Sequence, residues 1–294
     1  MILVTGAAGK TGQAVIKALV ARRQPVRALV RRDEQTQIVK SLGAEEAIVG
    51  DMRDATTLKR VTQGVHAVYH ICPNVSPEEI QIGKTAIAAA REAGVERFVF
   101  HSVMHPQTEA MTHHWNKLRV EEALFESGLA YTILQPSSYM QNVLGGWKAI
   151  VERGVYTAPY TVEARMSMVD LEDVTQAAAV VLTETGHLGA TYELAGPEVL
   201  TQTQIAEILS KHLKRAVRAE QITIEAWTLQ ARASGMGEYQ IDTLVRMFHY
   251  YDRNGFWGNP HTLSQLLDRA PTKFETFIER VIRQMTNRYQ NLHT

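Results

Sequence analysis

Short apolar runs alternate with longer amphipathic stretches through the first half of the chain. Helical spacing of apolar residues separates the runs, most clearly in residues 80–93 and 112–126. The runs that predict strands are residues 1–4, 26–30, 47–49, 67–71, 97–101 and 131–134. Strands that alternate with helices form parallel sheets covered on both faces. The pattern therefore predicts an α/β fold with a doubly wound parallel sheet.

Beyond Pro136 the alternation loosens and helices dominate. The pattern predicts strands at 166–170 and 192–195 and helices at 139–151, 173–182 and 201–213, with mostly helix after that. We expect a smaller, α-rich C-terminal lobe over the carboxyl ends of the strands. This divides the chain into a first domain, residues 1–150, and a lobe, residues 151–294, with residues of about 166–190 returning to the first domain.

Three glycines follow the first predicted strand and precede a helix, in the spacing G-x-x-G-x-x-G. A turn without Cβ atoms lets a diphosphate approach the backbone, and a helix N-terminus offers it unpaired N–H groups. The alternative is a glycine turn with only a structural role. We predict a dinucleotide-binding turn whose contacts are Gly6, Ala8, Gly9, Lys10, Thr11 and Gly12.

Two arginines, Arg31 and Arg32, follow the second predicted strand, where dinucleotide folds meet the adenosine ribose. Arginine pairs its planar fork with a 2′-phosphate, whereas an acidic residue would bind the ribose hydroxyls of NAD. NADP is therefore favoured over NAD. Asp33 and Glu34 lie one or two residues further on, so NAD remains an alternative cofactor. The remaining alternative is that both arginines are ordinary surface charges.

The ends of the later strands supply further candidate cofactor contacts. Asp51 is placed to accept from the adenine amino group while Met52 packs on the ring, although Asp51 could instead cap a helix, as Asp54 is expected to do. Beyond the fourth strand we expect the backbone to pass the nicotinamide ribose. The remaining candidates follow the fourth, fifth and sixth strands and are Ile71, Cys72, Pro73, Ser102 and Pro136.

His113 and Lys117 are the candidate catalytic pair. Their i, i+4 spacing places both on one face of the predicted helix, where they can face the cleft at the strand ends. A lysine there can bind the nicotinamide ribose, and an imidazole can pass a proton to a reduced substrate. The alternative is a solvated helix start. The candidate substrate contacts are Tyr139, Asn142, His105 and Trp147, while most aromatic residues of the lobe are expected in its core.

Composition excludes several other classes of protein. Lys+Arg and Asp+Glu are balanced at 31 each, so no basic field would attract nucleic acid. The one cysteine, Cys72, cannot form an internal disulfide, which is typical of a reducing compartment. No apolar run reaches the roughly 18 residues of a membrane span. Since a strand is predicted from Met1, no room is left for a signal peptide, and we expect a cytoplasmic protein.

Metal and hydrolase chemistry lack their sequence patterns. Four histidines gather between residues 101 and 114, but no H-E-x-x-H or C-x-x-C motif accompanies them. We therefore expect no metal site. A G-x-S-x-G nucleophile elbow is also absent from the sequence, which argues against a hydrolase.

Several stretches together resemble the NmrA-like family, an atypical branch of the short-chain dehydrogenase/reductases. The resemblance runs from Met1 to about Phe277. It is carried by residues 4–12, Ala28 to Arg31, Gly50-Asp51, His113 through Gly128 with Lys117 and Glu121, Tyr131 to Pro136, Met140 to Asn142, Val169-Asp170, Asp173-Val174, Tyr192 to Leu194, Gly196 to Glu198, and Arg269 to Pro271 with Phe274.

The resemblance implies a Rossmann domain that forms a cleft with a small C-terminal lobe and binds NADP or NAD. It also implies that Arg31 meets the 2′-phosphate and that Lys117 stands where the family has its cleft lysine. Typical short-chain dehydrogenases carry Tyr-x-x-x-Lys, with the tyrosine as proton donor. This chain has His113-x-x-x-Lys117, so the standard carbonyl-reduction mechanism lacks its tyrosine.

Relatives of this branch include reductases of quinones, dyes or aromatic ethers, and proteins that bind the cofactor without turnover and report its redox state to a partner. Our first hypothesis is an NADPH-dependent reductase of a small conjugated or aromatic, quinone-like acceptor. The second is a non-catalytic NADP(H)-binding sensor with a regulatory protein partner. Monomer and homodimer both remain open.

Overall fold

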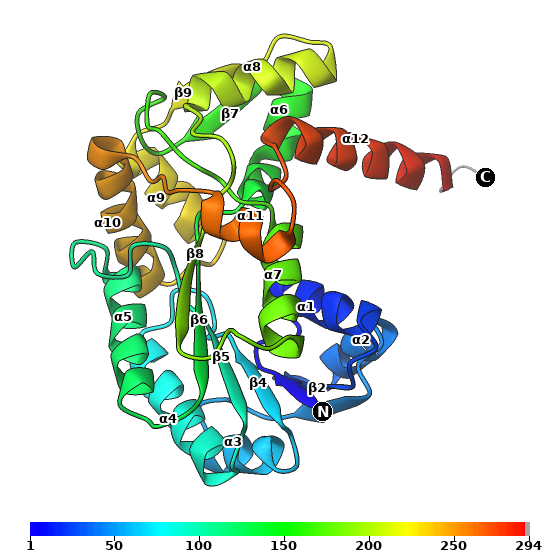
Figure 1. Cartoon of the computed structure of the whole chain (residues 1–294). Coiled ribbons are helices and arrows are strands. Elements are labelled where there is room, and N and C mark those ends of the chain that lie inside the picture. Colours follow the sequence, from blue (N-terminus) through cyan, green and yellow to red (C-terminus); the bar gives the residue numbers. More distant parts are fainter. Residues whose placement is uncertain (292–294) are drawn as a thin grey trace.

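The computed structural model describes residues 1–291 and contains a seven-stranded sheet in the order β3-β2-β1-β4-β5-β6-β8 (Figure 1). All neighbouring strands in it are parallel. The strands are β1 Ile2–Val4, β2 Val26–Val30, β3 Glu46–Val49, β4 Ala67–His70, β5 Arg97–His101, β6 Tyr131–Pro136 and β8 Ala190–Leu194. The strand order reverses between β1 and β4, which creates the crevice where such sheets bind ligands.

Helices cover both faces of this sheet, because each buried strand exposes an apolar face on either side. Apolar side chains of α1, α2 and α7 pack on one face, and those of α3, α4 and α5 pack on the other. These helices are α1 Lys10–Ala21, α2 Glu34–Ser41, α3 Ala55–Thr62, α4 Glu79–Glu92, α5 Thr112–Phe125 and α7 Leu171–Thr183. The predicted doubly wound α/β fold is confirmed.

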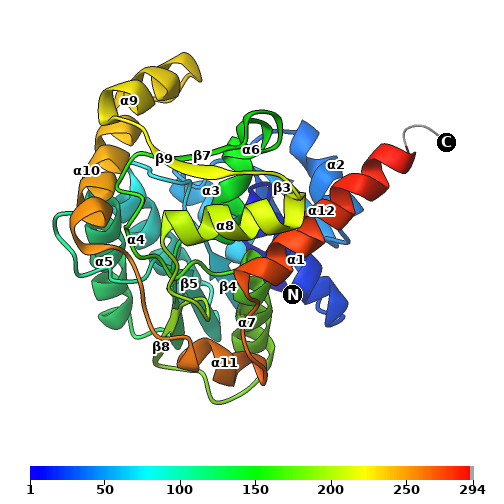
Figure 2. The same ribbon diagram turned by 90° about the horizontal axis from the view of Figure 1, so that it is seen from above.

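The C-terminal lobe has its own apolar core and lies over the carboxyl ends of the strands (Figures 1 and 2). A Cβ atom at Gly258 of the lobe would lie 2.5 Å from the Met104 sulfur, just past β5. The lobe is built from η1 Met140–Gly146, α6 Trp147–Arg153, α8 Gln202–Leu213, α9 Ile224–Ala233, α10 Glu238–Asn254 and α12 Phe274–Asn291, while α11 His261–Leu267 packs on α7 and β8.

Local signals in the sequence placed several helix ends correctly. The Asp54 carboxylate accepts from the backbone of Thr56 and Thr57 and caps α3, as predicted. Thr201 caps α8 with a capping box, and Gly128 adopts the left-handed conformation after α5 with φ of +74°. These caps depend only on neighbouring residues, which is why the sequence reveals them.

Two expectations for the lobe were incomplete or wrong. The predicted strand at 166–170 is an extended segment that pairs only through single bridges, such as Met166 with Leu200 and with Phe256. The segment is apolar because it is buried, but the residues that it pairs with lie in loops and not in a strand of the sheet. The sequence analysis also missed a parallel pair of short strands, β7 Val155–Ala158 and β9 Arg218–Gln221, because β9 reads Arg-Ala-Glu-Gln and has no apolar run.

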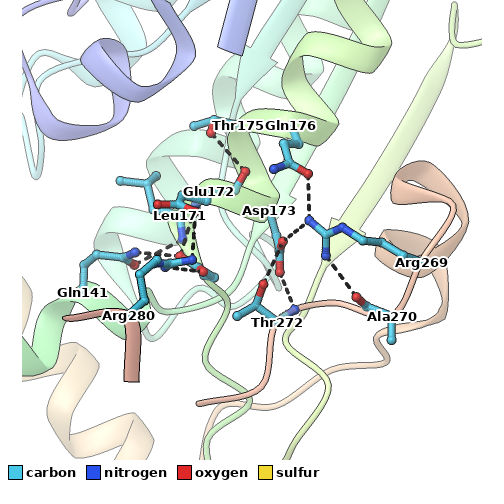
Figure 3. A network of polar contacts seen from close by, with 11 residues as sticks. Gln141, Leu171, Glu172, Asp173, Thr175, Gln176, Arg269, Ala270, Thr272 and Arg280 are labelled. Atoms are coloured by element: carbon cyan, nitrogen blue, oxygen red, sulfur yellow. Dashed lines mark hydrogen bonds and ion pairs between the residues drawn. The ribbon is translucent and has the colours of Figure 1, made fainter. Parts of the chain in front are cut away.

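A network of buried charges ties the lobe to the sheet at the start of α7 (Figure 3). Asp170 and Asp173 are both fully buried there. Arg280 of α12 donates to Asp170 at 2.6 Å, and Arg269 donates to Asp173 at 2.6 Å. Gln141 of η1 donates to Asp170 at 2.7 Å, so one carboxylate holds both α12 and the segment that follows β6. The network thereby fixes the position of the lobe over the crevice.

We predict that Arg280→Met lowers the free energy of unfolding by about 3 kcal/mol, because it leaves the Asp170 carboxylate buried without its cation. Arg246→Met is the matched control, since its ion pair with Asp242 is exposed at both ends and contributes less than about 1 kcal/mol. Urea denaturation of both variants measures the difference. Equal losses in the two variants would contradict the role assigned to Asp170.

Candidate functional site

The glycine turn between β1 and α1 can only be built from glycine at two of its positions. Gly6 has φ of +57°, and a Cβ atom there would lie 2.9 Å from the Ile71 carbonyl oxygen. A Cβ atom at Gly12 would lie 2.4 Å from the Gly6 carbonyl oxygen. The turn therefore packs directly against the end of β4 and against its own helix, which leaves its outer side bare.

The N-terminus of α1 carries no cap from its own side chains. Gly9 is the N-cap residue and makes no side-chain hydrogen bond, and the first turn contains no acidic residue. Gly9 and Lys10 are exposed, Ala8 is partly exposed, and Thr11 lies 9% exposed in the first turn. The first N–H groups of a helix need an acceptor, and an anion supplies one. The bare turn and these amides together fit a dinucleotide diphosphate.

The arginines that follow β2 and β3 differ in whether an acidic side chain pairs with them. Arg31 is exposed, and within the described residues its guanidinium has no hydrogen-bond or ion-pair partner. Arg32 is also exposed but pairs with Glu34 at 2.8 Å. Arg53 binds the Asp51 carboxylate through two nitrogens and lowers the pKa of Asp51 to about 2. Arg31 is therefore the arginine at this edge whose fork is open to a ligand.

Met52, next to this edge, packs against the core between the sheet and α3. The segment after β4, in contrast, follows the glycine turn closely. Thr5 donates to the Ile71 carbonyl at 3.1 Å and accepts from the Ile71 N–H at 2.9 Å. Pro73 is exposed. Cys72 is buried, and burial together with the nearby Glu79 carboxylate raises the pKa of its thiol.

Lys117 is buried in an ion pair that the sequence analysis missed. Its ammonium group donates to Glu79 at 2.9 Å and to the His101 carbonyl at 3.2 Å. Lys117 is 5% exposed and Glu79 is 1% exposed. The second Glu79 oxygen is buried and has no hydrogen-bond partner among the described residues. No local pattern indicates this pair, because Glu79 begins α4 while Lys117 belongs to α5.

His113 is a neutral imidazole at physiological pH. Burial, and then the Lys117 charge, hold the pKa of His113 well below its usual value. The neighbouring His114 is fully buried and bonds the Met104 carbonyl through Nδ1 at 2.9 Å. His113 would therefore have to take up a proton before it could act as an acid. The structure thus places the two predicted catalytic residues on one helix, with Lys117 in an ion pair and His113 as a neutral ring.

Ser102 faces inward rather than into the crevice. Its hydroxyl donates to Glu121, which also accepts two hydrogen bonds from Gln135 at 2.9 and 3.0 Å. Burial raises the pKa of the Glu121 carboxyl group. Pro136 is buried at the end of β6, and its carbonyl accepts from the Met104 N–H at 2.9 Å. Ser102 and Pro136 thus shape the crevice floor mainly through the backbone.

The four predicted substrate contacts are not gathered around one hollow. An open hollow of about 560 Å³ is lined by residues 254–260 with Val199, Tyr250 and His105, so only His105 of the four reaches it. Tyr139 bonds His101 at 2.8 Å instead. Asn142 is exposed and bonds Ser138, and Trp147 packs against the lobe core. Aromatic side chains dominate the hollow, with Phe256 and Trp257 beside His105.

Ligand atoms spaced for a metal ion lie together elsewhere in the part of the chain with described side chains. His212, Glu275 and Glu279 form that group between α8 and α12. Lys211 and His212 both bond the same Glu275 oxygen, so the protein's own side chains already engage it. Through residue 291, no helix is long and apolar enough to cross a membrane.

The fold and the glycine turn define a protein of the Rossmann type. Comparison with known proteins shows the family within this class. The model of the NmrA-like family matches residues 1–288, so the chain belongs to this family. The chain is 31% identical to the NAD(P)H azoreductase of Xenophilus azovorans, with 94% of this chain and 96% of that protein covered. It is 27% identical to quinone oxidoreductase 2 of Escherichia coli, with 92% and 95% covered.

Solved structures show the same architecture. The structure of an NADPH-dependent quinone oxidoreductase from Escherichia coli in complex with NADPH matches with a TM-score of 0.85 at 27% identity, covering 96% of this chain and all of that one. The triphenylmethane reductase of a Citrobacter species, complexed with NADP(H), matches with a TM-score of 0.83 at 24% identity, covering 95% and 99%. The predicted membership in the NmrA-like family is confirmed.

The buried histidines predict a steep loss of stability in acid. Burial lowers the pKa of His70 and His101 to about 3 and that of His114 to about 4. The unfolded chain binds these protons near pH 6.5, whereas the folded protein does not, so stability present above pH 6.5 falls as the pH drops toward 4. We expect the free energy of unfolding to fall by about 5 kcal/mol between pH 6.5 and pH 5.

Urea denaturation at pH 7.5, 6.5 and 5 measures this dependence. His114→Gln should reduce the slope by about one proton, that is about 1.4 kcal/mol per pH unit. His261→Gln, at an exposed position at the start of α11, should leave the slope unchanged. A stability profile that stays flat down to pH 5 would show that the histidines are not held neutral.

Proposed function

We propose that this protein is an NADPH-dependent reductase of flat, conjugated acceptors such as quinones or azo dyes. The observation that carries the proposal is the uncapped N-terminus of α1 above a turn that only glycine can form. Two relatives that align along nearly the whole chain are named as a quinone oxidoreductase and an azoreductase. A matching solved structure of such an oxidoreductase is described as an NADPH complex.

In this proposal, the crevice residues hold the cofactor along the carboxyl edge of the sheet. The backbone of residues 6–12 receives the diphosphate, and the open fork of Arg31 takes the 2′-phosphate, with Arg32 beside it. Asp51 and Met52 border the adenine. The backbone of Ile71, Cys72 and Pro73 borders the ribose on the nicotinamide side, with Ser102 and Pro136 below. When bound, the nicotinamide supplies the hydride.

Lys117 is the residue proposed to orient the cofactor ribose. Glu79 and the His101 carbonyl occupy two of its three N–H donors, so one donor remains for a ribose hydroxyl. His113 contributes a neutral imidazole that can hold one water molecule. This water gives a proton to the reduced acceptor, and the hydroxide that remains is reprotonated from bulk solvent. The protein thereby contributes orientation and keeps all but this water away from the reacting groups.

The acceptor is proposed to enter at the hollow between the lobe and the end of β5. His105, Phe256 and Trp257 line it, and aromatic side chains suit a flat conjugated ligand. We propose residues 1–150, with 166–190, as the nucleotide domain, except that η1 and α6 within this range pack into the core of the lobe, which closes over the acceptor. Of the other predicted acceptor contacts, Asn142 and Trp147 remain secondary candidates, whereas the Tyr139 hydroxyl is engaged with His101.

The alternative of a non-catalytic sensor is not favoured. The relatives that align over nine-tenths or more of this chain include proteins named for reductase activities on small molecules. A buried cationic lysine on the crevice edge also suits turnover, because it fixes charge where the cofactor ribose would lie.

The test follows NADPH absorbance in the presence of a naphthoquinone or an azo dye. We expect oxidation above the background without protein, faster with NADPH than with NADH. Lys117→Met should lower kcat/KM about 100-fold, since orientation of the reacting groups is lost. Lys84→Met, an exposed lysine on α4, is the matched control and should behave like the parent protein.

Circular dichroism checks that Lys117→Met is folded, because this change leaves Glu79 buried without its cation. If the parent protein binds NADPH but oxidises it no faster than background with every acceptor, the reductase proposal is wrong.

A further inference from the structure

A chain of three hydrogen-bonded rings lies on the α1 side of the sheet. The Tyr69 hydroxyl of β4 bonds Nδ1 of His101 at the end of β5. Nε2 of the same imidazole bonds the Tyr139 hydroxyl, just past β6, at 2.8 Å. Tyr69 is fully buried and His101 is 5% exposed. The chain therefore runs from the core of the sheet toward the crevice.

Burial of Tyr69 fixes the direction in which the hydrogen bonds point. Within the described residues, His101 is the sole hydrogen-bond partner of the Tyr69 hydroxyl. A buried hydroxyl proton without an acceptor is costly, so Tyr69 must donate to Nδ1. A neutral imidazole carries one proton, and it must therefore be on Nε2. Burial holds the pKa of His101 at about 3, which keeps the imidazole neutral.

The outer end of the chain is a hydroxyl whose proton is not taken up by His101. Nε2–H of His101 donates to the Tyr139 oxygen, so the Tyr139 proton must point elsewhere. The Thr11 hydroxyl, in the first turn of α1, lies next to the Tyr139 hydroxyl. Tyr139 also packs on the same apolar cluster as Ile71 and Ala7, which flank the glycine turn. Whichever of these two hydroxyls donates to the other, one proton of the Tyr139–Thr11 pair remains for a ligand at the uncapped end of α1.

We propose that Tyr69, His101 and Tyr139 form a hydrogen-bond chain of fixed direction that makes the Tyr139 hydroxyl, together with Thr11, a donor to an anionic oxygen of a nucleoside diphosphate. This rests on the proposed function, because it adds a recognition residue to the same cofactor site. Tyr139 touches the ligand, while Tyr69 and His101 act through it as positioning residues. The lobe segment after β6 thereby contributes directly to binding the cofactor.

The chemistry of Tyr139 suits an anion better than proton transfer. Burial raises the pKa of its hydroxyl, with the Thr11 hydroxyl opposing the shift only in part. The phenol therefore keeps its proton over the physiological range and is a weak acid toward a reduced product. A hydroxyl that always donates is the group that a phosphate oxygen requires.

Calorimetric titration with two probes tests the proposal. NADPH carries the diphosphate, whereas 2′-AMP carries only the adenosine and the 2′-phosphate. We expect Tyr139→Phe to weaken NADPH binding about tenfold to 100-fold and to leave 2′-AMP binding unchanged, since it removes one hydrogen bond to a charged group. Tyr69→Phe should weaken NADPH binding about threefold to tenfold, although this residue cannot reach the ligand.

Tyr192→Phe is the matched control. Its hydroxyl also bonds Nδ1 of a histidine, His187, at 3.0 Å, at the outer edge of the same sheet. This variant should bind NADPH like the parent protein. If Tyr139→Phe binds NADPH as tightly as the parent, or loses 2′-AMP binding by the same factor, the proposal is overturned.

A measurement on the unaltered protein does not depend on any variant folding. Nitrogen NMR of the histidine rings should show His101 protonated at Nε2 and not at Nδ1; the opposite tautomer overturns the proposal. A parent protein that binds NADPH with the expected Tyr139 dependence but reduces no acceptor would disprove the reductase function and leave this inference standing. If the protein reduces an acceptor but Tyr139→Phe binds NADPH like the parent protein, the reductase function stands and this inference is wrong.

Discussion

The whole account depends on the close approach of α1 to the strand ends. Gly6 and Gly12 allow the turn to pack against Ile71 and against its own backbone. The helix begins at an N-cap without a side-chain acceptor, and its first amides remain to be satisfied. A diphosphate is a ligand that supplies the missing acceptors and the missing negative charge.

The groups around this turn form a crevice whose charges are set by burial. Lys117 forms an ion pair with the equally buried Glu79, whereas burial holds the pKa values of His101 and His113 below their usual range because it penalises the cation. Asp170, at the start of α7, accepts from Gln141 and pairs with Arg280, and so holds the segment that carries Tyr139 over the same crevice. The fold thus places a fixed cation, neutral imidazoles and oriented hydroxyls along one edge of the sheet.

The sequence revealed those parts of the fold that depend on neighbouring residues. The inner strands β1, β4, β5 and β6 are buried on both faces, so each produced an apolar run, and the caps Asp54 and Thr201 were equally local. Interactions between distant segments left no such signal. The Glu79 partner of Lys117 and the chain from Tyr69 to Tyr139 join different strands and helices, so only the folded chain brings them together.

The most direct test of the central claim replaces Gly9 with aspartate. Gly9 has φ of −73°, which any residue adopts, and an aspartate N-cap would satisfy the α1 amides with its own carboxylate, which offsets a close contact of 3.2 Å between its Cβ atom and the Gly6 carbonyl oxygen. Calorimetry and thermal unfolding of Gly9→Asp should show a melting temperature near that of the parent protein together with at least about a 100-fold loss of NADPH affinity. An aspartate variant that binds NADPH as tightly as the parent protein would show that the diphosphate does not lie at this turn.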